Sequence, residues 1–410
     1  MSVRQQLDAM GQAARDAAES LRDAPAEQRS QAIRAIANHI RNRSAQILAA
    51  NAQDVAEATT MVDRLLLNPE RLEAMARAIE EIADLPDPVG EVMDSWTRPN
   101  GLQISRVRTP IGVIGMIYES RPNVTADAAA ICLRSGNAII LRSGSEALRS
   151  ALAIGEAITA ALAETGLPEA VVQIVPTADR DAVGAMLEGL DGTIDLIIPR
   201  GGRTLVERVS KDARVPVLGH LEGVCHTYVH ASADPEMAAQ IVRNAKLRRV
   251  SVCGSTETLI IDREVAPSLL PCIAAELQGC ELRGDQEARA IVPMKSATEA
   301  DWHTEYLEPI LSVKTVEGLD EATDHIAKYG TRHTEAIVAE DAAAAEEFLN
   351  RVDSAIVMWN ASTQFADGGE FGFGAEIGIA TGKLHARGPV GPAQLTTFKY
   401  QVRGSGQIRP

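Results

Sequence analysis

The sequence lacks long hydrophobic runs, because its longest apolar stretches, such as residues 111–118, have the length of a β-strand. Its first residues lack the apolar core of a secretory signal. Only 5 cysteines occur among 410 residues, without the spacing of a disulfide framework and without the clustered Cys/His pattern that indicates zinc. These absences favour a metal-free globular protein of the reducing cytoplasm.

Aromatic residues and positive charge are also scarce. Aromatic residues make up 3% of the chain, and the formal net charge is −16. A chain with few rings to stack on bases and an excess of acidic groups is not expected to bind nucleic acid or anionic membranes. Its 45% of hydrophobic residues can fill the cores of two or three domains.

The first hundred residues predict helices followed by a hairpin. Apolar residues recur at helical spacing within residues 7–21 and 33–47, and a proline-initiated helix is predicted over 68–82. An Asn-Gly pair in the middle of residues 96–107 predicts a β-hairpin. The tail, residues 395–403, alternates like an edge strand and could pair with this hairpin, within the chain or across a subunit boundary.

After the hairpin, short apolar runs alternate with helical segments. The expected strands of this first series are residues 111–117, 138–141, 171–175, 194–198 and 215–218. Such a series folds as a parallel sheet with helices on both faces, and ligands bind at the carboxyl ends of its strands. A second α/β unit is expected to follow, with strands after Cys253 and near residues 310–316, 336–338 and 355–359.

Two of the expected strands end in segments suited to phosphate. Arg142, Ser143 and Ser145 follow one strand, and Gly201 and Gly202 follow another. A helix that starts there would offer free N–H groups and a positive dipole end, so a dinucleotide cofactor is the natural ligand. The usual Gly-x-Gly-x-x-Gly fingerprint is missing, however, and such glycines often only form turns; both interpretations stay open.

Cys253 is the candidate nucleophile. It lies in a Gly-Ser turn close to Lys246, Arg248 and Arg249, and neighbouring cations lower the pKa of a thiol. The alternative is a small buried hydrophobic residue, which is how we interpret the other four cysteines.

Several segments match a known family. They are residues 117–125 (IYESRPNVT), 223–226 (GVCH), the Cys253 turn, and residues 325–337, 360–371, 374–381 and 385–391. Through them the whole chain resembles the γ-glutamyl phosphate reductase family, the glutamate-5-semialdehyde dehydrogenases of the aldehyde dehydrogenase superfamily. The resemblance implies an aldehyde dehydrogenase-like α/β fold, with a Rossmann-type cofactor domain, a second α/β catalytic domain and a β-flap for oligomerisation.

The resemblance also implies domain limits. Residues 1–94 and 110–222, with a return segment near 352–384, would form the NADP-binding domain, and residues 223–351 the catalytic domain. Residues 95–109 and 385–410 would form the hairpin and tail of a homodimer or larger homo-oligomer.

The activity implied is the NADPH-dependent reduction of L-glutamyl 5-phosphate to L-glutamate 5-semialdehyde. It would proceed through a thioester on Cys253 with release of phosphate, as the second step of proline biosynthesis from glutamate. Glutamate 5-kinase is a candidate partner for channelling.

Further residue roles follow from the family match. Asn123 is expected to stabilise the oxyanion together with the Cys253 N–H, and Glu305 to hold the nicotinamide ribose. The alternatives are a turn-forming asparagine and an exposed glutamate. Arg121, Arg387 and His385 are expected to bind the substrate anions, although Arg387 would otherwise anchor its own loop.

Other functions stay open at this point. An oxidising aldehyde dehydrogenase would need a glutamate base, and Glu222 stands out of register for that role. A cysteine acyltransferase or hydrolase would need a histidine base, for which His220, His226 and His385 are available, although a structural role is expected for His220. An inactive assembly subunit would not need the intact cysteine turn.

Overall fold

The computed structural model describes residues 2–59 and 62–409, which divide into two compact units. Unit 1 combines the described residues up to Gly219 with Gly372–Gly378 and the described residues from Val390 onward. Unit 2 comprises His220–Phe371 and Ile379–Pro389. Within the described part of the chain, no helix is long and apolar enough to span a bilayer.

Unit 1 opens with helices whose buried stripes confirm the predicted helical spacing. They are α1 (Val3–Asp23), α2 (Ala26–Asn42), α3 (Ser44–Glu57), α4 (Val62–Leu65) and α5 (Pro69–Asp84). The start of α5 follows from local chemistry. The Asn68 side chain accepts a hydrogen bond from the Arg71 N–H at 2.7 Å, and Pro69 occupies the first helical position, where no donor is needed.

The sheet of unit 1 has four parallel strands in the order β5-β4-β3-β6. The strands are β3 (Val113–Tyr118), β4 (Ala138–Ser143), β5 (Val172–Ile174) and β6 (Leu196–Arg200), and the intervening helices are α6 (Asn123–Arg134), η1 (Ser145–Ala147), α7 (Leu148–Glu164), η2 (Glu169–Val171), α8 (Arg180–Leu187) and α9 (Arg203–Asp212). The fifth strand predicted over residues 215–218 is only a bridge from Val217 to Ile197. Pro216 has no N–H to donate to a longer ladder.

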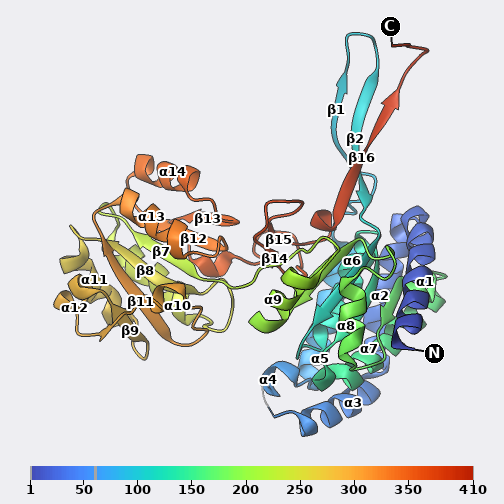
Figure 1. The fold of residues 1–410 in the computed structure, drawn as a ribbon, viewed down its shortest axis with the longest axis horizontal. Coiled ribbons are helices and arrows are strands. Elements are labelled where there is room, and N and C mark those ends of the chain that lie inside the picture. Colours follow the sequence, from blue (N-terminus) through green and yellow to red (C-terminus); the bar gives the residue numbers. More distant parts are fainter. Residues whose placement is uncertain (1, 60–61, 410) are drawn as a thin grey trace. The chain divides into compact units, whose positions relative to one another are not determined.

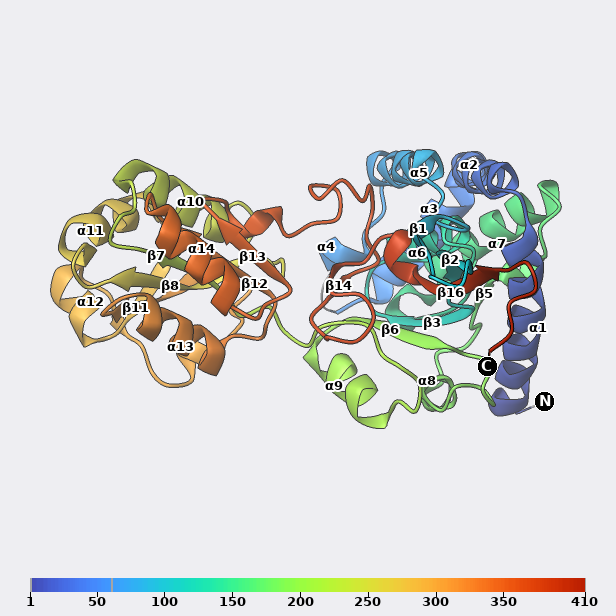
Figure 2. The same ribbon diagram turned by 90° about the horizontal axis from the view of Figure 1, so that it is seen from above.

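Helices cover both faces of this sheet (Figures 1 and 2). Buried residues of α1, α8 and α9 form one core with β3 and β4, and α6 and α7 lie on the opposite face. Tyr118 pairs in register with both Ser143 and Arg200, the last residues of their strands. The segments that follow these three strands therefore emerge at one edge.

A three-stranded antiparallel flap extends from unit 1 (Figure 1). It consists of β1 (Val92–Thr97), β2 (Gln103–Pro110) and β16 (Thr396–Arg403), with β16 entered through η5 (Ala393–Leu395). The predicted hairpin is confirmed. The predicted pairing of the tail with the hairpin is also confirmed, because β16 pairs with β2 of the same chain, from Thr396 opposite Pro110 to Arg403 opposite Gln103. Pairing within the chain satisfies the backbone groups of β2 without a partner.

Unit 2 contains a seven-stranded parallel sheet in the order β10-β9-β11-β8-β7-β12-β13. Its elements are β7 (Cys225–Val229), α10 (Pro235–Leu247), β8 (Thr256–Asp262), α11 (Ala266–Glu276), β9 (Glu281–Gly284), α12 (Gln286–Ile291), β10 (Lys295–Ser296), η3 (Asp301–His303), β11 (Ile310–Val316), α13 (Leu319–Tyr329), β12 (Thr334–Val338), α14 (Ala342–Arg351), β13 (Ile356–Trp359) and η4 (Thr363–Phe365). Helices α10 to α12 pack on one face, and α13 and α14 pack on the other (Figure 2).

The expected return of residues 352–384 to the first domain differs from the observed division. Strand β13 pairs with β12 at the edge of the seven-stranded sheet, so residues up to Phe371 belong to unit 2. The expected tail is also divided, because the short strands β14 (Ile379–Ala380) and β15 (Gly388–Pro389) pair with each other within unit 2. The pairing of β13 with β12, and of β14 with β15, therefore determines which of these residues belong to unit 2.

A buried ion pair connects α10 to β8, the two elements on either side of the Cys253 turn. Lys246 Nζ lies 2.5 Å from Glu257 Oε2, and both side chains are fully buried. Burial raises the pKa of Glu257 to about 7, although Lys246 opposes the shift. Each partner therefore depends on the other to remain charged inside unit 2.

Replacing Lys246 by methionine should leave Glu257 buried without its partner. We expect the free energy of unfolding of unit 2 to fall by about 3–5 kcal/mol at pH 8. The loss should shrink below pH 7, because a carboxyl whose folded pKa is raised takes up a proton there and no longer carries a buried charge. Urea denaturation followed by tryptophan fluorescence measures this, with the exposed Lys211→Met as control. Equal losses at pH 6 and pH 8 would contradict the assignment.

Candidate active site

The candidate site lies at the amino edge of the unit 2 sheet. Glu305, Cys253, His220 and His333 stand in the segments that precede β11, β8, β7 and β12, and these four strands are neighbours in that order. Because all four run parallel, their amino ends meet at one edge. Residues that are up to 113 positions apart in the sequence (His220 to His333) are thereby brought together.

The Cys253 turn is fixed by close backbone contacts. The Ser255 N–H donates to the Val252 carbonyl at 3.0 Å, and the Cys225 thiol donates to the Cys253 carbonyl at 3.1 Å. A Cβ atom at Gly223 would stand only 2.0 Å from the Cys253 carbonyl oxygen, so glycine is required there. The half-buried Cys253 side chain also packs beside the apolar cluster that contains Ile379.

Two histidines flank the sulfur. Cys253 Sγ and one nitrogen of each of His220 and His333 all lie within 4.8 Å of one another. The His220 ring is oriented by a 2.7 Å hydrogen bond between Nδ1 and the Ile379 carbonyl, and it meets the His333 ring edge to face, with centroids 4.8 Å apart. His333 is fully buried, and its Nδ1 lies 2.9 Å from Thr334 Oγ1.

These histidines set the protonation state of the candidate nucleophile. Burial alone would raise the pKa of the Cys253 thiol, but the charge of His333 and the proximity of both imidazoles to the sulfur outweigh burial and hold the pKa well below its ordinary value. The sequence had suggested other cations for this role. That suggestion was wrong for Lys246, because Lys246 forms an ion pair with Glu257. The side chains of Arg248 and Arg249 are exposed.

Glu305 lies beside the same turn. Its carboxylate accepts a hydrogen bond from the Gly223 N–H at 3.0 Å, which joins it to the glycine that packs against Cys253. Burial raises the pKa of Glu305, and the negative charge of Cys253 adds to this effect. The interpretation of Glu305 as a simply exposed glutamate is therefore wrong, and its expected contact with the nicotinamide ribose stays a prediction.

The expected substrate residues are not all available for anions. The two terminal nitrogens of Arg387 donate to the Asp353 carboxylate at 2.7 Å and to the Asp353 carbonyl at 2.9 Å. This contact favours the alternative role, an anchor of the loop between β14 and β15. His385 is exposed in the same loop with a φ of 65°, and Arg121 is half-buried in unit 1 just before α6.

The expected cofactor residues gather at the carboxyl edge of the unit 1 sheet. Arg142 is buried and donates from Nη2 to the Ala178 carbonyl at 3.0 Å, while its Nε has no hydrogen-bond partner among the described residues. The Ser143 hydroxyl donates to the Gly144 carbonyl, and Ser145 is exposed at the start of η1. An unpaired buried guanidinium nitrogen suits an anionic ligand group.

The second expected phosphate position is already occupied by a carboxylate. Glu119 accepts a hydrogen bond from the Gly202 N–H at 2.9 Å, and a Cβ atom at Gly201 would stand 2.4 Å from the same carboxylate. The expectation of a free N–H at Gly202 is therefore wrong. The physical reason is that a helix N-terminus, here that of α9, favours any nearby anion, including one from its own chain.

Asn123 is the first residue of α6 in unit 1. Its side chain is exposed, and its amide donates to the Asp127 carboxylate at 2.9 Å. Burial raises the pKa of Asp127 to about 6, against the lowering effect of this hydrogen bond. Asn123 therefore begins a helix and does not form a turn. Its expected role as a hydrogen-bond donor to the oxyanion stays a prediction.

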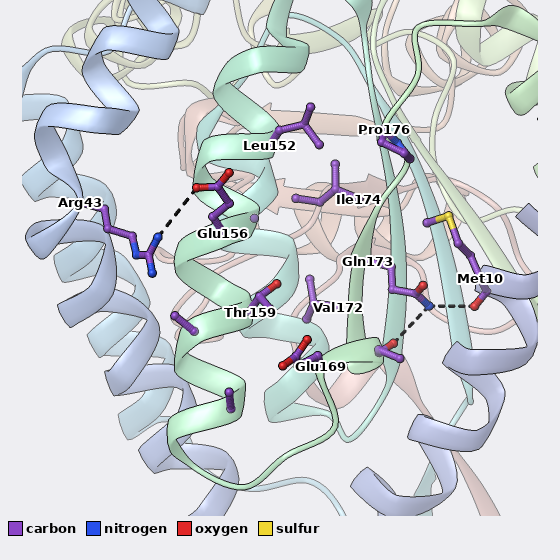
Figure 3. Close-up of a pocket in the computed structure, with 14 residues that line it drawn as sticks. Met10, Arg43, Leu152, Glu156, Thr159, Glu169, Val172, Gln173, Ile174 and Pro176 are labelled. Carbon is purple, nitrogen blue, oxygen red and sulfur yellow. Dashed lines mark hydrogen bonds and ion pairs between the residues drawn. The ribbon is translucent and has the colours of Figure 1, made fainter. Parts of the chain in front are cut away.

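A separate pocket of about 780 Å³ lies in unit 1 (Figure 3). Helix α7 and strand β5 form most of its wall, and Arg43 and Glu156 face each other across one side, 3.8 Å apart. Gln173 closes another side by donating to the Met10 carbonyl. None of the expected cofactor or substrate residues lines this pocket.

Sequence analysis missed the role of His333 and underrated that of His220. His333 stands shortly before the strand predicted near residues 336–338, which was the available signal, but no motif spacing links it to Cys253. Of the other histidines considered as a base, His226 is fully buried, with Nδ1 2.8 Å from the Glu335 carboxylate.

Comparison with known proteins places this chain in a family. The aldehyde dehydrogenase family model matches residues 2–308. The γ-glutamyl phosphate reductase of Caulobacter sp. (strain K31) is 63% identical over 100% of both chains, and that of Caulobacter vibrioides is 64% identical over 98% of this chain and 99% of its own. The chain belongs to the γ-glutamyl phosphate reductase family.

Solved structures agree with this assignment. The γ-glutamyl phosphate reductase of Thermotoga maritima superposes with a TM-score of 0.95 at 46% identity, over 98% of this chain and 99% of its own. An engineered glycolyl-CoA reductase with bound NADP⁺ shares the fold, with a TM-score of 0.69 at 17% identity, over 97% of this chain and 96% of its own. The expected aldehyde dehydrogenase-like α/β fold is confirmed for this member of the γ-glutamyl phosphate reductase family.

Replacing His333 by glutamine should raise the pKa of the Cys253 thiol toward the ordinary value of 9.0, because the charge that opposes burial is removed. At a pH below the thiol pKa, the thiolate fraction falls about tenfold each time the pKa rises by one, so alkylation of Cys253 by iodoacetamide at pH 6.5 should slow at least roughly tenfold. Mass spectrometry of the peptides resolves Cys253 from the exposed Cys272, which serves as an internal reference.

The matched control is His303→Gln, because the His303 side chain is exposed before β11 and does not belong to the cluster around the sulfur. This variant should keep the pH profile of the wild-type protein. Unchanged profiles for both His333→Gln and His220→Gln would show that neither histidine sets the thiol pKa.

Truncating Arg387 to alanine distinguishes its two roles. If it anchors its loop to Asp353, stability should fall by about 1 kcal/mol, while kcat/KM stays within about threefold of wild type. Lys383→Ala is the matched control, because Lys383 contacts the same carboxylate. A hundredfold loss of kcat/KM at unchanged stability would instead assign Arg387 to the substrate.

Proposed function

We propose that the protein reduces L-glutamyl 5-phosphate to L-glutamate 5-semialdehyde with NADPH and releases phosphate, as a step of proline biosynthesis. The observation that carries this proposal is the Cys253 sulfur between His220 and His333, in a chain with 63% identity to a γ-glutamyl phosphate reductase over its full length. A thiolate at neutral pH is the nucleophile that an acyl phosphate requires.

The first chemical step belongs to Cys253. Its thiolate forms a C–S bond to the acyl carbon, and the C–O bond to phosphate breaks with the electron pair leaving on phosphate. The N–H of Cys253 and the side chain of Asn123 are the proposed donors to the tetrahedral oxyanion. His220 and His333 hold the sulfur as a thiolate before attack, so no separate base is needed for this step.

The second step returns the thiolate. NADPH, when bound, would supply the hydride for the thioester carbon. The thiohemiacetal alkoxide on Cys253 then re-forms a carbonyl as its C–S bond breaks, so the aldehyde is released and the sulfur again carries the negative charge that the two imidazoles stabilise. Attack of water on the thioester would hydrolyse it to the carboxylic acid before hydride transfer. Glu222 stands out of register for the glutamate base of oxidising dehydrogenases, which favours reduction.

Cofactor binding is proposed for the carboxyl edge of the unit 1 sheet. The buried Arg142, with its unpaired Nε, fits a 2′-phosphate, and Ser143 and Ser145 flank it. Glu305 is proposed for the nicotinamide ribose. Gly202 would meet a cofactor phosphate only if the Glu119 carboxylate moved from its N–H.

Substrate anions and assembly complete the proposal. Arg121 and His385 remain candidates for the phosphate and α-carboxylate, in a protein whose net charge of −16 otherwise repels both. The flap carries the exposed side chains of Trp96, Phe398 and Tyr400, which suit a homo-oligomer contact. Channelling from glutamate 5-kinase would supply the acyl phosphate directly.

The reverse reaction separates this function from its alternatives. Purified protein mixed with semialdehyde, phosphate and NADP⁺ should form NADPH only when phosphate is present, and Cys253→Ser should remove turnover while leaving NADPH binding intact, because a serine hydroxyl is not ionised near neutral pH. Cys272→Ser, at an exposed cysteine, is the control. Phosphate-independent NADPH formation would indicate an oxidising dehydrogenase, and hydrolysis of acyl phosphate without NADPH would indicate a hydrolase.

The Arg142→Ala variant tests the cofactor preference. Losing a charged hydrogen-bond donor to the 2′-phosphate should raise KM for NADPH by roughly tenfold to a hundredfold, about 1.5–3 kcal/mol, with little effect on NADH. Arg149→Ala is the matched control, because Arg149 is an exposed arginine paired with Glu57. Equal use of both cofactors by wild type, or an unchanged preference in the variant, would remove Arg142 from the cofactor site.

A further inference from the structure

The cluster around Cys253 has a second chemical property, which is independent of the reaction. Its three side chains offer one thiolate and two imidazole nitrogens, the donor set that Zn²⁺ and other borderline-soft divalent ions prefer over Mg²⁺ or Ca²⁺. The donor atoms of His220, Cys253 and His333 all lie within 4.8 Å of one another. Tetrahedral zinc, with Zn–N near 2.1 Å and Zn–S near 2.3 Å, needs them roughly 3.3–3.7 Å apart.

The orientation of the two rings also suits a metal. His220 is held through Nδ1 by the Ile379 carbonyl at 2.7 Å, so its neutral ring carries the lone pair on Nε2. An imidazole held through its other nitrogen by a carbonyl is the usual arrangement of a zinc-ligating histidine. Side-chain rotations would have to bring the donor atoms closer by at most about 1.1–1.5 Å.

A second, independent observation comes from His333. Its side chain has no exposed surface, and its Nε2 has no hydrogen-bond partner among the described residues. The other nitrogen, Nδ1, lies 2.9 Å from Thr334 Oγ1 and 3.6 Å from Cys225 Sγ. A buried polar nitrogen without a partner is costly, and a metal ion would satisfy it.

We propose that His220, Cys253 and His333 form a three-ligand Zn²⁺ site, with an open fourth position for water, and that zinc reversibly inhibits the enzyme by capturing its nucleophile. Binding would convert the thiolate into a metal ligand and release any protons held by the two imidazoles. A zinc-bound sulfur is no longer available to the acyl carbon. Affinity should therefore fall as the pH is lowered, because protons compete for all three ligands.

The lack of a sequence motif is consistent with this site. The ligands stand at positions 220, 253 and 333, before three different strands, and not in the paired short spacings of structural zinc motifs. Catalytic zinc sites typically have three protein ligands and one open coordination position, whereas structural zinc sites have four protein ligands.

Titration with Co²⁺ tests the site without any need for turnover. Full-length protein, freed of metals with EDTA and desalted, should bind one equivalent of Co²⁺ and show thiolate-to-metal charge-transfer absorption together with the intense d–d bands of a tetrahedral ion. Zn²⁺ should displace the cobalt, and Zn²⁺ should inhibit NADPH formation over the same concentration range, with full recovery on adding EDTA.

Variants assign the ligands. Cys253→Ser should lose the charge-transfer band, and His333→Gln and His220→Gln should each weaken Co²⁺ binding at least roughly tenfold. His303→Gln, outside the cluster, should bind Co²⁺ like wild type.

The proposal is overturned if no saturable cobalt spectrum appears below about 100 µM, a generous limit for such a donor set. It is also overturned if the band survives in Cys253→Ser, or if both ligand-histidine variants bind like wild type. Using the two histidine variants in parallel guards against one that fails to fold.

Discussion

The candidate active site depends on the electrostatic stabilisation of a half-buried sulfur by two imidazoles. Removal from water disfavours the charged form of Cys253, and the protein offsets this cost with His333 and His220. Neither ring is held by a single flexible contact. His333 stands at the start of β12 beside Thr334, and the Ile379 carbonyl orients His220 from the short ladder of β14 and β15. The low pKa of the Cys253 thiol thus follows from groups that the strands bring together at the edge of the sheet.

The two units use opposite edges of their parallel sheets. In unit 1 the polar segments follow the strands, at the carboxyl edge where α/β proteins usually bind ligands. In unit 2 the reactive residues precede the strands. A Cβ atom at Gly223 would collide with the Cys253 backbone, and the N–H of Gly223 is bonded to Glu305, so close backbone packing determines the geometry at this edge.

Much of the fold was predictable because its signals are local. Strand β11 has the predicted limits, and the Asn68-Pro69 helix start was confirmed. The cysteine turn was also found from local residue types. The histidines around it were not, because their proximity to Cys253 arises from strand order, which no short segment encodes. The carboxylate of Glu119 at Gly202 was missed for the same reason: a helix N-terminus predicts an anion, but not which anion fills it.

The most direct test of the account is to trap the acyl group on the sulfur. Protein mixed with L-glutamyl 5-phosphate in the absence of NADPH, quenched in acid and digested, should yield a glutamyl adduct on the Cys253 peptide by mass spectrometry, with one equivalent of phosphate released. Hydroxylamine should remove the adduct, as expected for a thioester, and later addition of NADPH to unquenched enzyme should convert it to semialdehyde. Phosphate release without an adduct on Cys253, or an adduct on another residue, would contradict the central role assigned to this thiolate.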